Sequence, residues 1–89
     1  MSTAAVKIQI KLYASLADHL PPGVPTHEGA VLELPEGTSP HALIDELDVP
    51  RDLAHLVLRN GVYIAPEERD QPVLRDGDEF AVWPPIAGG

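Results

Sequence analysis

The chain has 89 residues, a formal charge of −8 and no cysteine, so it has room for one domain only. The missing cysteine excludes disulfides, thiolate metal sites, iron–sulfur clusters and cysteine nucleophiles. Fourteen acidic residues against six basic ones argue against a nucleic-acid partner, and the lack of a long apolar run or signal-peptide pattern predicts a cytoplasmic protein that does not enter a membrane.

The chain begins with a strand and a short helix. Residues 1–5 show no pattern, and we expect them to be flexible. Apolar residues then alternate without a break from Val6 to Tyr13, which predicts a half-buried strand with its even-numbered residues inside and Tyr13 outside. Residues 14–20 have helical spacing, and residues 21–29, rich in proline and glycine, are expected to form a loop.

A second strand and the main helix follow. A strand is predicted at residues 30–34. Ser39 followed by Pro40 is typical of a helix start, because the serine hydroxyl can cap the helix and proline is favoured at the first helical position. We expect this helix to continue until Pro50. Its apolar stripe consists of Leu43, Ile44 and Leu47.

A hairpin is predicted next. Residues 56–59 and 62–64 are apolar runs joined by Asn60-Gly61, and Asn-Gly favours the type I′ turn because both central residues need a positive φ. We interpret Leu56 and Leu58 as inward-facing and Tyr63 as outward-facing.

The polar stretch that follows leads to the last strand. Residues 65–71 read as a loop, and Asp76-Gly77-Asp78 as a tight turn whose carboxylates we expect to be solvated. In the last strand, Phe80 and Val82 are expected to pack under the helix, so that Trp83 points away from it.

The chain then runs out as a stiff arm. Pro84 and Pro85 cannot donate to a sheet and fix φ near the polyproline value, and Ile86 and Ala87 lead from them to two glycines. Gly88 and Gly89 have no Cβ, which would let a tail pass through a narrow channel and leave its carboxylate open to a nucleophile. An ordinary frayed terminus is the alternative.

These elements predict an α+β fold, a small mixed sheet with one main helix on one face. We expect one domain over residues 6–85 with a flexible tail at 86–89. The other sheet face would be uncovered, and three of the four aromatic residues would lie on it near the start of the tail. Exposed aromatic patches usually mark a partner surface, although such rings can also simply shield a sheet from water. The three are Tyr13, Tyr63 and Trp83.

No side-chain constellation typical of catalysis or metal binding is present. The four histidines are scattered, without the spacing of a metal pair, and no serine lies in a Gly-x-Ser-x-Gly context. The interpretation is a protein that enzymes act on, with no catalytic residues, bound cofactor or metal of its own. The histidines are His19, His27, His41 and His55.

At two places the sequence resembles the MoaD/ThiS family of small sulfur carriers. Trp83-Pro-Pro-Ile-Ala-Gly-Gly89, entered through Gly77-Asp78-Glu79, is similar to the closing signature of that family. Tyr13-Ala-Ser-Leu-Ala-Asp18 resembles the helix entry of the molybdopterin synthase small subunit. The resemblance covers residues 6–89 and implies the ubiquitin-like β-grasp fold.

The resemblance also implies a function. A partner of the ubiquitin-activating type would use ATP to adenylate the Gly89 carboxylate, which is then converted to a thiocarboxylate. In the molybdopterin branch the tail inserts into the large subunit and delivers sulfur to a pterin precursor. Gly88 and Gly89 would form the reactive end. The docking surface implied by the resemblance and by the tail comprises Tyr13, Tyr63, Trp83, Pro84, Pro85, Ile86 and Ala87.

Other readings stay open at this point. The short helix at residues 14–20 favours the molybdopterin branch, while the thiamine, cysteine and transfer-RNA thiolation branches are alternatives. A ubiquitin-like modifier would instead attach Gly89 to lysines of other proteins. An interaction domain with an inert tail is the third class.

Overall fold

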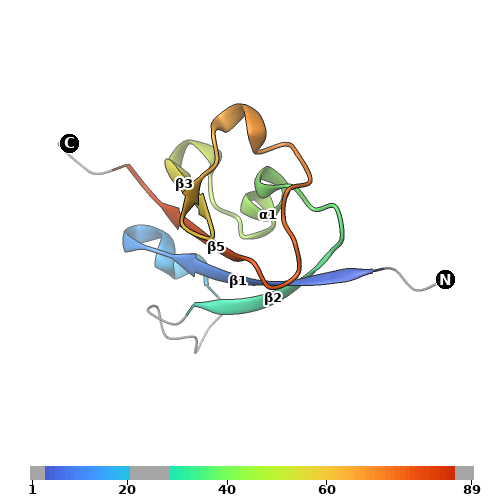
Figure 1. Ribbon diagram of the computed structural model, residues 1–89. Helices are drawn as coiled ribbons and strands as arrows, with labels where there is room; N and C mark the ends of the chain where they lie inside the picture. Colours follow the sequence, from blue (N-terminus) through green and yellow to red (C-terminus); the bar gives the residue numbers. More distant parts are fainter. Residues whose placement is uncertain (1–3, 21–28, 86–89) are drawn as a thin grey trace.

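The computed structural model describes residues 4–20 and 29–85, which form a mixed sheet with one α-helix against one face (Figure 1). Short helical segments separate the strands, except at one hairpin. In chain order the elements are β1 (Ala5–Leu12), the 3₁₀ helix η1 (Ala14–His19), β2 (Ala30–Pro35), α1 (Pro40–Glu46), η2 (Arg51–Leu53), β3 (Leu56–Arg59), the two-residue β4 (Val62–Tyr63), η3 (Pro66–Glu68) and β5 (Glu79–Trp83).

The first and last strands lie side by side in the middle of the sheet. The strand order is β2-β1-β5-β3-β4, with β1 and β5 parallel and every other pair antiparallel. The parallel register places Leu12 opposite Val82. The residues that follow β1 and β5 therefore emerge together at one end of the sheet, which brings Tyr13 beside Trp83.

The core lies between the sheet and α1, as the alternation predicted. The even-numbered residues of β1 are buried, and so are Phe80 and Val82 of β5. The predicted stripe of Leu43, Ile44 and Leu47 packs against these strand residues; the first two lie in α1 and the third is the residue at its C-terminal end. Burial of these side chains is the main stabilising contribution in a domain this small.

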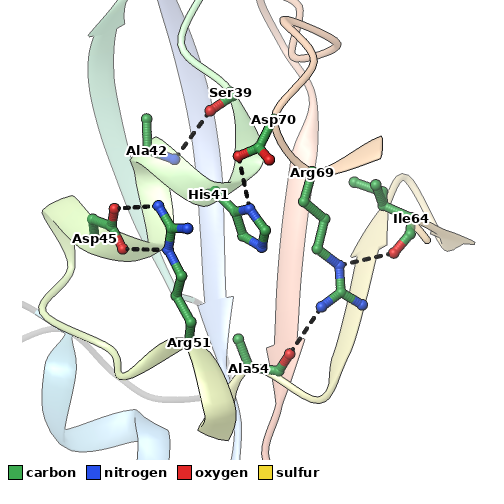
Figure 2. A network of polar contacts seen from close by, with 9 residues as sticks. All are labelled: Ser39, His41, Ala42, Asp45, Arg51, Ala54, Ile64, Arg69 and Asp70. Carbon is green, nitrogen blue, oxygen red and sulfur yellow. Dashed lines mark hydrogen bonds and ion pairs between the residues drawn. The ribbon is translucent and has the colours of Figure 1, made fainter. Parts of the chain in front are cut away.

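The main helix begins as predicted and ends earlier than expected. The Ser39 hydroxyl accepts a hydrogen bond from the Ala42 N–H at 3.1 Å, and Pro40 occupies the first helical position (Figure 2). At the other end the chain leaves the helix at Leu47, and Asp48 adopts a left-handed φ of 59°. This backbone reversal, rather than Pro50, ends the helix.

The segment after β1 is helical, as expected, but its form is 3₁₀. Six residues are too few for a long α-helical ladder, and short helical pieces commonly take this tighter form. Leu16 and Leu20 are both buried, and the His19 ring lies 3.1 Å from the Leu47 carbonyl oxygen. The packing of η1 against the core thus agrees with the spacing that predicted it.

The hairpin confirms the predicted turn but not the predicted strand faces. Asn60 and Gly61 both have positive φ, 51° and 81°, as a type I′ turn requires. Val57 is fully buried, whereas Leu56 is 36% exposed and Leu58 half-buried, so the inward assignment of the two leucines is wrong. The pairing of Val57 with Val82 of β5 fixes this register.

Candidate functional site

The sheet face opposite α1 carries an aromatic stack beside the end of β5. The rings of Tyr13 and Trp83 are parallel to within 8°, and their centroids are 3.9 Å apart. Trp83 nevertheless keeps 39% of its surface exposed. Stacked rings of this kind supply a large apolar surface at little entropic cost, as partner surfaces require.

Three further side chains extend this surface across β3 and β4. Leu56 lies directly across from Trp83, and Leu58 pairs with both Ala81 and Tyr63. Tyr63 is 51% exposed, and its outward orientation agrees with the prediction. We call the group the aromatic patch; it consists of Tyr13, Leu56, Leu58, Tyr63 and Trp83. Leu56 was missed from the sequence because all residues from Leu56 to Leu58 are apolar and give no alternation.

The backbone around Tyr13 holds its ring in place. The Tyr13 N–H donates to the Val82 carbonyl oxygen at 3.1 Å, which continues the β1–β5 pairing one residue beyond β1. Ala14 then turns into η1 with φ of 53°, a left-handed conformation that is costly for a residue with a Cβ. The packing of Leu16 into the core offsets this strain, and the turn leaves Tyr13 over Trp83.

The other end of the open face is polar. Lys11 and Glu79 form an ion pair of 3.3 Å between β1 and β5, and Lys7 and Gln9 lie further along β1 on the same face. Apart from the exposed Val31 of β2, the large apolar side chains on this face are thus gathered at the end where β5 stops. A partner that buries the aromatic patch would reach the beginning of the arm at the same time.

The start of the arm is fixed to the sheet. The His55 N–H donates to the Trp83 carbonyl oxygen at 3.1 Å, and Pro84 is half-buried while Pro85 is exposed. The last four predicted site residues, Ile86, Ala87, Gly88 and Gly89, lie outside the described residues, so their role stays a prediction.

A buried arginine that the sequence analysis missed supports this region. Arg69 is only 5% exposed, and its guanidinium donates to the carbonyl oxygens of Ile64 at 3.0 Å and Ala54 at 3.1 Å (Figure 2). It also reaches the His55 carbonyl and the Tyr63 hydroxyl, both at 3.4 Å. Arg69 therefore joins the segment before β3 to the residue after β4 and contacts Tyr63 of the aromatic patch.

Asp78 fastens the hairpin to the start of β5, contrary to the expectation of a solvated carboxylate. It is 7% exposed and accepts hydrogen bonds from Arg59 Nε at 2.6 Å, Asn60 Nδ2 at 2.9 Å and the Arg75 N–H at 2.7 Å. Asp76 is also engaged, since it accepts from the Lys7 N–H at 2.7 Å. A sequence pattern of Asp-Gly-Asp signals a turn and does not reveal such tertiary partners.

The Asp78 carboxylate should make stability depend on pH. Its burial alone would raise the pKa, but the hydrogen bonds from Arg59, Asn60 and Arg75 together lower the pKa of Asp78 below its usual value. A lowered folded-state pKa stabilises the fold at pH values above the unfolded-state pKa, and this contribution is lost as the pH falls through the folded-state pKa.

We therefore expect Asp78→Asn to lower the free energy of unfolding by about 2 kcal/mol at neutral pH. The difference from the wild type should shrink as the pH falls from about 5 toward 2, in urea unfolding at each pH. Asp45→Asn is the control, because Asp45 is paired with Arg51 on the surface, where ion pairs contribute little. Equal losses for the two variants would contradict the role given to Asp78.

The described residues carry neither a cluster typical of metal binding nor a helix typical of membrane insertion. Across residues 4–20 and 29–85, no three His, Asp or Glu side chains come together as metal ligands would. In the same ranges no helix has the length and apolar character needed to cross a bilayer.

Solved structures with a similar fold are known. The HVO 2177 protein of Haloferax volcanii superposes with a TM-score of 0.75 at 18% identity, over 100% of this chain and 92% of that one. Small archaeal modifier protein 1 of H. volcanii superposes with a TM-score of 0.62 at 22% identity, and the match covers 91% of this chain and 99% of that one. One chain from a complex of subunits 1 and 2 of the molybdopterin-converting factor of Helicobacter pylori superposes with a TM-score of 0.51 at 16% identity. This match covers 94% of this chain and 100% of that one. At these identities the likeness shows the fold, which is the ubiquitin-like β-grasp.

The sequence itself matches a known family, while no curated protein matches it. The match to the ThiS family covers residues 11–89, which include β5, the aromatic patch and the arm. This range is nearly the whole chain, and the fold agrees with it. The chain therefore belongs to the ThiS family.

Proposed function

We propose that this protein is a sulfur carrier whose Gly89 is adenylated by an ATP-using enzyme of the ubiquitin-activating type and then converted to a thiocarboxylate for molybdopterin synthesis. The observation that carries the proposal is the position of the aromatic patch. Tyr13 and Trp83 stack at the point where β5 ends and the Pro84-Pro85 arm begins. A partner that docks there is placed to receive the tail.

The chemistry requires little from this chain beyond its carboxylate. An oxygen of the Gly89 carboxylate attacks the α-phosphorus of ATP, and pyrophosphate leaves. A sulfur nucleophile supplied by a partner then attacks the carbonyl carbon, and AMP leaves with the electron pair of the broken C–O bond. The two glycines would keep this carbon accessible, and the catalytic groups belong to the partners.

The choice of molybdopterin as the destination rests on the segment after β1. The resemblance to the molybdopterin synthase small subunit included a helix beginning at Tyr13-Ala14, and η1 occupies this place. In that branch the carrier is also the small subunit of the synthase, and its second partner would be the large subunit. Thiamine, cysteine and transfer-RNA thiolation are the alternative destinations.

A mass measurement tests the carrier function. The protein is incubated with an activating enzyme, ATP and a sulfur donor, and its intact mass is recorded. We expect the gain that corresponds to sulfur replacing one oxygen, located on Gly89 by fragmentation, with no gain when ATP is omitted. An unmodified chain under conditions that modify a known carrier would contradict the proposal. Adding the modified chain to a molybdopterin synthase large subunit and precursor then tests the destination.

The modifier function is the second candidate, because small archaeal modifier protein 1 shares the fold. It predicts an isopeptide bond between Gly89 and lysine side chains of other proteins. Immunoblots of cell lysate would then show conjugates of higher mass that disappear on removal of Gly88 and Gly89. Free chain alone on such blots would oppose this second function.

A further inference from the structure

A hollow of about 300 Å³ lies beside the β3–β4 hairpin, next to the aromatic patch. Val62, Ile64 and Val73 form apolar walls, and Tyr63 borders it as well. Val62 is 69% exposed, a large value for an aliphatic side chain. Since Tyr63 also belongs to the aromatic patch, the hollow continues that surface around the edge of the sheet.

Two charged residues also line the hollow, and they differ in their partners. Arg59 is engaged, because its Nε donates to Asp78 at 2.6 Å. Glu68 is exposed, and within the described part of the chain no cation pairs with its carboxylate. The hollow therefore combines apolar walls with one carboxylate that is available to a ligand.

This combination fits a long basic side chain. Arginine and lysine place their aliphatic stems on apolar surfaces while their charged ends pair with an acid. The charge of −8 on the whole chain would also attract a basic partner surface. An acidic side chain would be repelled by Glu68, and a purely apolar one would leave that carboxylate to be desolvated without compensation.

We propose that this hollow receives an arginine or lysine side chain of the enzyme that activates Gly89, with the stem against Val62, Ile64 and Val73 and the charge on Glu68. The identity of that partner rests on the proposed function. The aromatic patch would supply apolar contact area, and Glu68 would select partners with a basic residue at the edge of the interface.

The main test compares two neighbouring glutamates. The KM of the activating enzyme for this chain is measured by ATP–pyrophosphate exchange for the wild type, Glu68→Gln and Glu67→Gln. Glu67 lies on the same turn and does not line the hollow. We expect Glu68→Gln to raise KM about tenfold, with kcat unchanged and a smaller effect at high salt. The Glu67 variant should behave as the wild type, and equal KM values for both variants would overturn the inference.

A second test does not use the enzyme. N-acetyl-argininamide is titrated into the ¹⁵N-labelled protein, and we expect saturable shifts of the amide signals of Val62, Ile64 and Val73. These shifts should vanish in Glu68→Gln, and their absence from the wild type would overturn the inference. If the wild-type chain were not adenylated at all, the proposed function would fail, whereas the shifts would still report on the hollow.

Discussion

Replacing Arg69 with alanine is expected to lower the free energy of unfolding by about 3 kcal/mol, because the change leaves buried carbonyl groups without donors. The guanidinium donates to the carbonyl oxygens of Ala54, Ile64 and His55 and lies 5.7 Å from the centre of the Tyr63 ring. For a domain of this size the loss corresponds to a fall in melting temperature on the order of 15 °C.

Two arginine variants make the Arg69 measurement specific. Arg75 also donates to backbone carbonyls, those of Pro72 and Leu74, but it is exposed, so Arg75→Ala should change urea unfolding little. Arg69→Lys should recover only part of the loss, because an ammonium cannot reproduce the planar fork that reaches Ile64 and Ala54 together. If Arg69→Ala cost no more than Arg75→Ala, the buried contacts would not be stabilising.

The parts of the fold that the sequence predicted are those controlled by local rules. Unbroken alternation fixed the buried face of β1, Ser39 and Pro40 located the start of α1, and Asn60-Gly61 identified the type I′ turn. Each of these signals acts over a few neighbouring residues. The same is true of the outward orientation of Trp83, which follows from the burial of Val82.

The features that escaped prediction depend on contacts between distant segments. The faces of β3 are decided by its pairing with β5, which no local pattern reveals when Leu56, Val57 and Leu58 are all apolar. Arg69 lies in a polar stretch, and only the tertiary fold brings Ala54 and Ile64 to its guanidinium. The sequence therefore predicted which aromatic residues lie on the open face, but it did not reveal the polar groups that hold them in place.

Those polar groups connect the buried network to the start of the arm. Arg69 holds the His55 carbonyl, the His55 N–H holds the Trp83 carbonyl, and the Trp83 ring stacks on Tyr13. The end of β5 is thus fixed by both its backbone and its side chain. A docking partner would meet a preformed surface and would not have to order it, which favours affinity.

Trp83→Ala is accordingly expected to weaken binding to the activating enzyme by about 30-fold, which corresponds to about 2 kcal/mol. Trp83 joins both halves of the aromatic patch, since it stacks on Tyr13 and lies across from Leu56. Calorimetric titration of the folded variants against the enzyme gives the Kd values directly. Trp83→Phe should lose less affinity than Trp83→Ala, because the smaller phenylalanine ring can still stack on Tyr13.

Val31→Ala is the matched control for Trp83→Ala. Val31 is an apolar residue, 66% exposed, that pairs with Gln9 on the same sheet face but outside the aromatic patch. Truncating the Val31 side chain should leave the Kd for the activating enzyme unchanged if the binding energy is concentrated at the end of β5. A loss as large as that of Trp83→Ala would show that the whole face binds, and no loss in either variant would place the partner elsewhere. Only a loss confined to Trp83 agrees with docking beside the arm that carries Gly89.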